Sequence, residues 1–138
     1  MTFLVERLGE LRRYLAHLEG LRDRVSDAGS LRADLSLHND VLFSLLSICQ
    51  LVIDIAGELS SRSELSFTTY AESVRNLEQL DPFDAALVSS LVRLVGFRNV
   101  LLHEYVSFDL ERAVAALHDL EPVHQFVAAV GQIEDAAG

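Results

Sequence analysis

The chain has 138 residues, 50% of them hydrophobic, with only two prolines and seven glycines. This length and composition favour one domain with a sizeable core built from long helices. The formal charge is −10 and all 11 basic residues are arginines, so the chain as a whole repels nucleic acid, and binding RNA would require a local basic site or a basic partner.

The most apolar stretch, residues 41–55, predicts a core helix rather than a membrane span, because it contains Asp54 and three further polar residues. Residues 1–13 carry five charged side chains and show no signal peptide, so we expect a cytoplasmic protein. Cys49 is the only cysteine and lies within the apolar stretch. This excludes an internal disulfide and predicts a small core residue, with catalysis by the thiol as a remote alternative.

Apolar residues at spacings of three and four predict five helices. The first covers residues 3–25, and its leucines alternate spacings of four and three, which is the seam pattern of helices packed nearly parallel or antiparallel. A break at residues 27–30 follows, with Gly29 as a possible helix stop and Ser30 as the next cap. The second helix then covers residues 31–59.

After a polar loop at residues 60–64, a short third helix is predicted over residues 69–80. Asp81 and Pro82 open the fourth helix, because aspartate can cap a helix and proline suits its first turn. This fourth helix is expected to cover residues 83–105.

The fifth helix is predicted to follow a cap at Ser107 or Asp109 and to run to about Ile133, with a kink at Pro122. The chain contains no internal repeat, linker or low-complexity tract. Together these elements predict an all-α fold, an antiparallel bundle of about five helices. We expect one domain over residues 1–138, with a frayed tail at 134–138.

The fourth helix carries an arginine on its apolar face. An unpaired buried guanidinium would cost roughly several kcal/mol, so Arg98 needs a carboxylate, water or a ligand anion. In the second helix, Asp54 shares a face with Gln50 and is the most attractive counter-charge; the alternative places it on a solvent face beside Glu58, and the sequence leaves both open. The apolar stripe around Arg98 is expected to comprise Leu87, Leu91, Leu94, Val95 and Leu102.

Helical spacing gathers four polar residues near the end of this helix. Arg98 and Tyr105 are seven apart, and Asn99 and His103 are four apart on the adjoining arc. An arginine can hold a phosphate by two hydrogen bonds, a histidine can move a proton, and an asparagine can orient either, so the patch suits chemistry on a phosphodiester. The alternative is a structural ion pair at Arg98 and a satisfied helix-end histidine.

Residues 98–105, Arg-Asn-Val-Leu-Leu-His-Glu-Tyr, resemble the signature of HEPN ribonucleases. The version that ends in tyrosine resembles the HepT-like toxins of the HepT–MntA toxin–antitoxin family. Gly96 and Phe97 before the motif, residues 50–55 in the second helix, and the position of the motif at the end of the fourth of five helices are also similar to that family. The resemblance covers nearly the whole chain.

The resemblance implies a HEPN-like homodimer in which two motif helices form a composite cleft. It implies a metal-independent endoribonuclease toxin of a type VII-like system, in which the 2′-hydroxyl of the RNA attacks. His103 would act as general base or acid, Arg98 would hold the scissile phosphate, and Asn99 would position either group. The expected products are a 2′,3′-cyclic phosphate and a 5′-hydroxyl, and DNA should be inert.

The same resemblance implies a second role for Tyr105. In HepT-like proteins this tyrosine receives AMP from the partner, an MntA-like nucleotidyltransferase antitoxin, and the modification silences the toxin. From the residues alone, the plain alternative is that Tyr105 packs at the helix end with its hydroxyl in water.

We expect no metal, no cofactor and no membrane partner. The histidines outside the motif, His17, His38, His118 and His124, are scattered over the predicted helices and make no di-iron pattern.

Two alternatives to the enzyme stay open. The chain could be a non-catalytic helical module that docks onto a nucleotidyltransferase, or a plain dimerisation scaffold. His103 distinguishes the enzyme from these alternatives, since only the enzyme requires its imidazole to titrate.

Overall fold

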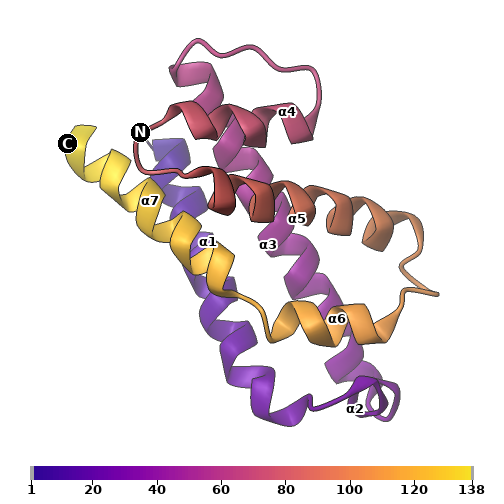
Figure 1. Cartoon of the computed structure of the whole chain (residues 1–138). Coiled ribbons are helices and arrows are strands. Elements are labelled where there is room, and N and C mark those ends of the chain that lie inside the picture. The colour runs from indigo at the N-terminus through magenta and orange to yellow at the C-terminus, as the bar shows by residue number, and fades with distance from the viewer. Residues whose placement is uncertain (1, 138) are drawn as a thin grey trace.

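The computed structural model describes residues 2–137, and every regular element within them is helical (Figure 1). The predicted all-α class is confirmed, with more and shorter helices than expected. In chain order the elements are α1 (Thr2–Leu21), the 3₁₀ turn η1 (Arg22–Arg24), α2 (Ala28–Arg32), α3 (Leu35–Arg62), α4 (Tyr70–Arg75), η2 (Asn76–Gln79), α5 (Ala85–His103), α6 (Leu110–Leu117) and α7 (Glu121–Ala137).

Five α-helices begin at a side-chain cap. Asp27, Asp34, Thr69 and Asp84 each accept a hydrogen bond from the backbone N–H three residues further on, and Asp109 accepts one from the N–H two residues on. A cap of this kind satisfies an N–H group that has no partner in the first turn and contributes about 1 kcal/mol. The predicted cap at Asp109 is therefore confirmed.

Two other predicted helix starts are wrong. Ser30 lies inside α2 rather than capping the next helix, because its backbone N–H is bound by the Asp27 carboxylate. Asp81 precedes α5 without capping it, because the Phe83 N–H donates to the Leu80 carbonyl and closes a turn there. In both places the helix begins at the aspartate that directly precedes its first turn.

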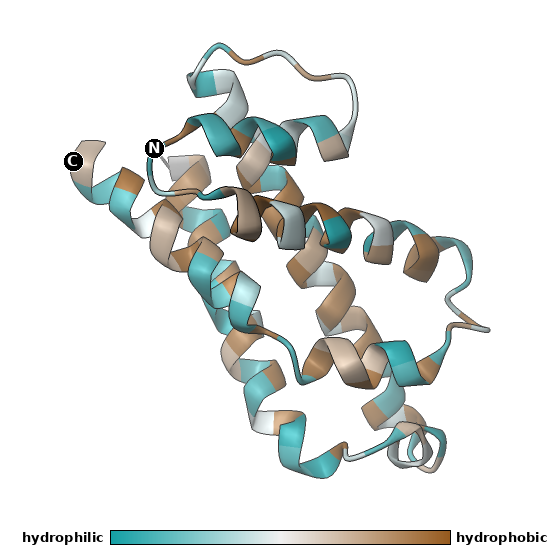
Figure 2. Cartoon of the chain, viewed as in Figure 1, coloured by the Kyte–Doolittle hydropathy of each residue, from teal (hydrophilic) through white to brown (hydrophobic). Residues whose placement is uncertain are grey.

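Helix α3 is the centre of the bundle. It packs against α1, α4, α5 and α6, and α5 crosses it (Figure 1). Apolar residues dominate the part of α3 that these helices surround (Figure 2). The predicted leucine seam of the first helix is confirmed, since its side chains are all buried. These are Leu4, Leu8, Leu11, Leu15 and Leu18.

By length and apolar composition alone, α3 and α5 could each cross a membrane, but the buried helices of a bundle meet the same criterion. Within the bundle, 56% of the most apolar window of α3 is buried, but only 33% of that of α5. The apolar character of α3 is therefore explained by its central position. Helix α5 instead keeps much of its apolar surface uncovered.

The predicted fifth helix is two helices rather than one kinked helix. Between α6 and α7, His118 Nε2 donates to the Val25 carbonyl at 2.7 Å, and Leu120 is buried. These contacts fix a break, and Pro122 falls at the second residue of α7, where its missing N–H needs no partner. Residues 134–137, expected to fray, continue α7, and Gly138 lies outside the described residues.

The C-terminal half of α5 is covered from a different side than predicted. Leu102, expected in the buried stripe, is 45% exposed, whereas Leu101 is fully buried. The reason is the returning chain: buried Phe108 packs edge-on against Phe97, with ring centroids 5.3 Å apart, and so covers the face that Phe97 shares with Leu101.

Leu101 and Leu102 make a matched pair that tests this register. We expect Leu101→Ala to lower the free energy of unfolding by about 2–5 kcal/mol, because it opens a cavity in the core. Leu102→Ala should lower it by less than about 1 kcal/mol. Chemical denaturation followed by circular dichroism measures both, and equal losses for the two variants would contradict the register of α5.

Candidate active site on helix α5

Arg98 is held by an amide rather than by a carboxylate. Its Nε donates to Gln50 Oε1 on α3 at 3.1 Å, and Gln50 Nε2 donates to Asp54 Oδ1 at 2.9 Å. The second Asp54 oxygen lies 4.0 Å from Arg7 Nε on α1. Asp54 thus reaches Arg98 only through Gln50, which joins the two residues that the sequence suggested as a pair.

The rest of the Arg98 guanidinium contacts the ring of Tyr70 and the side chain of Asn99. Its carbon lies 5.1 Å from the ring centroid of Tyr70, at the start of α4, and its NH1 donates to Asn99 Oδ1 at 3.0 Å. Of the five N–H donors of an arginine, the hydrogen bonds within residues 2–137 use two. Three donors on the terminal nitrogens remain for a ligand.

His103 is the last residue of α5, and its side chain is exposed. The hydrogen bonds that the described residues make around the motif end at Asn99 and do not reach the imidazole. Asn99 is bound to Arg98 rather than to His103, so it orients the arginine. The imidazole is therefore open to solvent and to a ligand at the end of the helix.

Tyr105 lies outside the helix, in the turn at residues 104–107. The prediction that helical spacing stacks it on Arg98 is wrong, because the helix ends at His103 and the backbone of Glu104 leaves the helical region. Its ring is half-buried, and this burial raises the pKa of the phenol above its ordinary value. The following residue, Val106, is 97% exposed, so the turn projects into solvent (Figure 1).

Sequence reasoning missed two contributors to this site. Gln50 was noted only for sharing a face with Asp54, although an amide on that face is the signal that could have marked it. Tyr70 was not considered, because the loop that precedes α4 decides which side chain reaches Arg98, and spacing within a helix carries no information about it.

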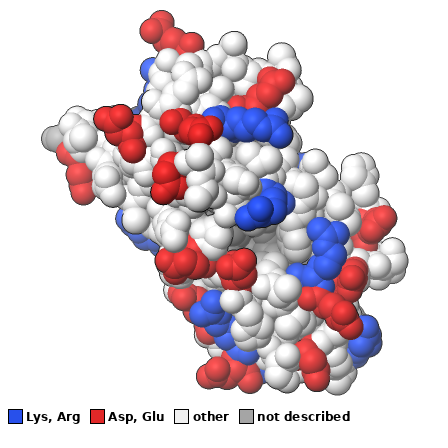
Figure 3. Space-filling model, viewed as in Figure 1, with Lys and Arg blue, Asp and Glu red and all other residues white. Residues whose placement is uncertain are grey.

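Charges on the face shown in Figure 3 are interleaved: arginines lie among acidic side chains and form no continuous basic stripe. This matches the formal charge of −10. A phosphate on this face would therefore be bound at individual guanidinium groups rather than along a basic surface.

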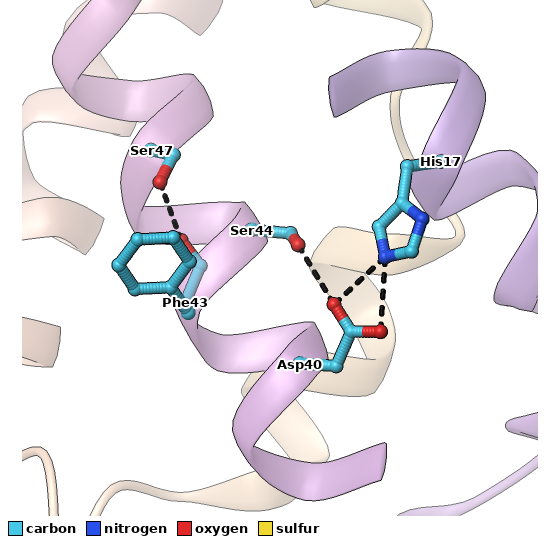
Figure 4. Close-up of polar contacts among 5 residues, drawn as sticks. All are labelled: His17, Asp40, Phe43, Ser44 and Ser47. Atoms are coloured by element: carbon cyan, nitrogen blue, oxygen red, sulfur yellow. Dashed lines mark hydrogen bonds and ion pairs between the residues drawn. The ribbon is translucent and has the colours of Figure 1, made fainter. Parts of the chain in front are cut away.

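The histidines outside the motif are held by protein groups. His17 Nε2 lies 2.7 Å and 2.9 Å from the two Asp40 oxygens, and Ser44 Oγ donates to Asp40 at 3.1 Å (Figure 4). The carboxylate stands between the hydroxyl and the imidazole, so the histidine does not activate the serine, and the cluster links α1 to α3. No group of three or more potential metal ligands occurs within the described residues.

The helical bundle has the fold of solved HEPN toxin structures. The chain belongs to the HepT-like ribonuclease family, whose model matches residues 11–130. A curated relative, the mRNA nuclease HepT of Shewanella oneidensis, is 24% identical over 126 residues, which span 90% of this chain and 92% of that protein.

Two solved structures show the same fold. A toxin–antitoxin structure with AMP-PNP superposes with a TM-score of 0.82 at 22% identity, covering 96% of this chain and 99% of that one. The tri-AMPylated HEPN toxin of Shewanella oneidensis, in complex with its MNT antitoxin, gives a TM-score of 0.81 at 22% identity, covering 96% and 98%.

Cys49 lies apart from the motif chemistry. It lines a cavity of about 220 Å³ between α3, α5 and α6, and the thiol is buried. Burial raises the pKa of the Cys49 thiol to about 12, against the smaller opposing effect of the positive charge on Arg98. A thiol that stays protonated at neutral pH is a poor nucleophile, so Cys49 is a core residue.

The raised pKa predicts an unreactive thiol. At pH 8, well below the pKa of about 12, we expect folded protein to resist iodoacetamide, and alkylation to become complete in guanidinium chloride. Intact mass spectrometry over time measures the adduct. Ala115→Cys, which places a thiol on an exposed position of α6, is the positive control; labelling of native Cys49 at the rate of that variant would contradict the assignment.

Proposed function

We propose that the chain is a metal-independent endoribonuclease toxin that acts in the cytoplasm as half of a type VII-like toxin–antitoxin pair. The observation that carries the proposal is the state of the motif: Arg98 is anchored through Nε with three N–H donors on its terminal nitrogens available, and His103 is exposed five residues further on. Membership of the HepT-like ribonuclease family supports the same activity.

In the proposed reaction, the RNA supplies its own nucleophile. His103 removes the proton from a 2′-hydroxyl, the 2′-oxygen bonds to the phosphorus, and the bond from phosphorus to the 5′-oxygen breaks. A second imidazole, from the partner copy, protonates the leaving 5′-oxygen. Arg98 stabilises the charge that builds on the phosphoryl oxygens, and the products are a 2′,3′-cyclic phosphate and a 5′-hydroxyl.

The proposed homodimer is supported by the exposed face of α5. Gly96, Asn99 and His103 recur at spacings of three and four, and all are exposed. A Cβ at Gly96 would meet nothing within 4 Å, so close packing inside the chain does not explain this glycine. The glycine would allow the backbone of a second α5 to approach closely. Leu102, next to His103, is exposed and offers apolar surface for the second copy to cover.

We also propose that a partner nucleotidyltransferase silences the toxin by attaching AMP to Tyr105. The turn that carries Tyr105 projects from the bundle, so its hydroxyl can enter the active site of another protein. A phenol is neutral at physiological pH, and burial raises the pKa of Tyr105 further, so the partner must supply the base that deprotonates it. The tri-AMPylated Shewanella toxin shows this class of modification on a similar fold.

Cleavage of total cellular RNA in excess EDTA tests the ribonuclease. We expect the purified protein to cut RNA but not DNA, and His103→Ala to lower the rate by at least about 100-fold, because a general base or acid contributes that much. His38→Ala, which removes an α3 histidine whose side chain bonds the neighbouring Asn39, is the matched control and should retain the wild-type rate. A His103→Ala variant that cuts as fast as wild type would favour the non-catalytic docking module.

Transfer of AMP can be tested by intact mass. After incubation with the partner nucleotidyltransferase, ATP and Mg²⁺, we expect wild type to gain adenylate mass, and Tyr105→Phe to gain none because it lacks the acceptor oxygen. Tyr14→Phe, which removes a hydroxyl on α1, controls for modification elsewhere. Adenylate on the Tyr105→Phe variant would overturn Tyr105 as the acceptor.

A further inference from the structure

We propose that Gln50 is a positioning residue that holds Arg98 ready for the phosphate without neutralising it. The inference rests on the proposed ribonuclease activity and deepens it. It starts from the chain of contacts that crosses three helices: Arg98 on α5, Gln50 and Asp54 on α3, and Arg7 on α1.

The direction of the Gln50 amide is fixed by its two neighbours. An arginine Nε can only donate a hydrogen bond, so the amide oxygen must face Arg98. The amide nitrogen must then face Asp54, which accepts when ionised. Reversing the amide would place two donors together at one end and two acceptors at the other, so the contacts leave one orientation.

Asp54 is itself held in place. Its second oxygen lies 4.0 Å from Arg7 Nε, and the Arg7 guanidinium carbon lies 4.3 Å from the ring centroid of Phe3. The Asp54 side chain is only partly exposed, at 33%. The acceptor that orients Gln50 is therefore tied to a second helix, and the orientation of Arg98 depends on how α1 and α3 pack.

A neutral acceptor has a chemical advantage at this position. A carboxylate bound directly to Arg98 would cancel much of its charge and would occupy the nitrogens that grip a phosphate in pairs. The amide oxygen of Gln50 binds Nε alone, Asn99 is a neutral acceptor for one N–H of NH1, and the other three donors and the positive charge stay available. Geometry and charge are thereby separated: Gln50 orients Arg98, and Asp54 acts one residue further away.

Two substitutions test these two parts. Gln50→Leu removes the acceptor, and we expect kcat to fall about tenfold or more, because a displaced catalytic group loses alignment. Gln50→Glu keeps an acceptor but adds a charge beside Arg98, so we expect KM for RNA to rise while Arg98 stays ordered. Ser47→Ala is the matched control, because this neighbour on α3 bonds only the Phe43 carbonyl of its own helix.

The second readout is independent of cleavage. Hydrogen exchange of the Arg98 Nε–H, followed by NMR on arginine-labelled protein, should quicken in Gln50→Leu and stay slow in Gln50→Glu and Ser47→Ala. Unchanged exchange in Gln50→Leu would overturn the proposal, as would a kcat equal to that of wild type. If wild type cuts no RNA, the proposed function fails, while the exchange experiment still shows whether Gln50 orders Arg98.

Discussion

A guanidinium can donate hydrogen bonds but cannot accept them, and this constraint organises the site. Arg98 projects from an apolar helix at the edge of the core, where water alone does not surround it. An acceptor must therefore come from the helix beneath, and the central helix α3 supplies Gln50. Because α3 also packs against α1, the orientation of Arg98 depends, through Gln50, on the positions of Asp54 and Arg7.

The exposure of the motif follows from how the chain leaves α5. Phe108 returns against Phe97 and covers the side of the helix that holds Leu101. The opposite side, which carries Asn99 and His103, is left uncovered. The helix also ends at His103, which moves Tyr105 into a projecting turn. One apolar contact thus separates the buried side of α5 from the exposed side that carries Asn99 and His103.

Local features of this fold could be predicted from the sequence, because they depend on neighbours along the chain. The leucine seam of α1 and the cap at Asp109 follow from spacing and from hydrogen bonding within one turn. The burial of Leu101 instead of Leu102 could not be predicted, since it depends on a loop that folds back over the helix.

The site shows the same division between local and long-range information. The motif residues are recognisable in the octapeptide, but the sequence leaves open whether Asp54 pairs with Arg98, and in the structure Gln50 lies between them. A pairing rule based on charge does not foresee an amide inserted between two ions. Nor does the sequence reveal the ring of Tyr70 over the guanidinium, because α4 and α5 meet only in the folded bundle.

Arg98 is anchored by a neutral amide and keeps its charge, and this bears on how so acidic a chain could act on RNA. With a net charge of −10, the protein has an excess of acidic groups, so each guanidinium that can meet a phosphate matters. Because the first contact of Arg98 is a neutral amide, a phosphate that approaches it meets an undiminished charge. Adenylate on Tyr105 would bring a phosphate of the same chemistry to this end of α5. In the proposed pair, silencing would therefore come from the bulk and the negative charge that the adenylate adds next to His103, at the end of α5.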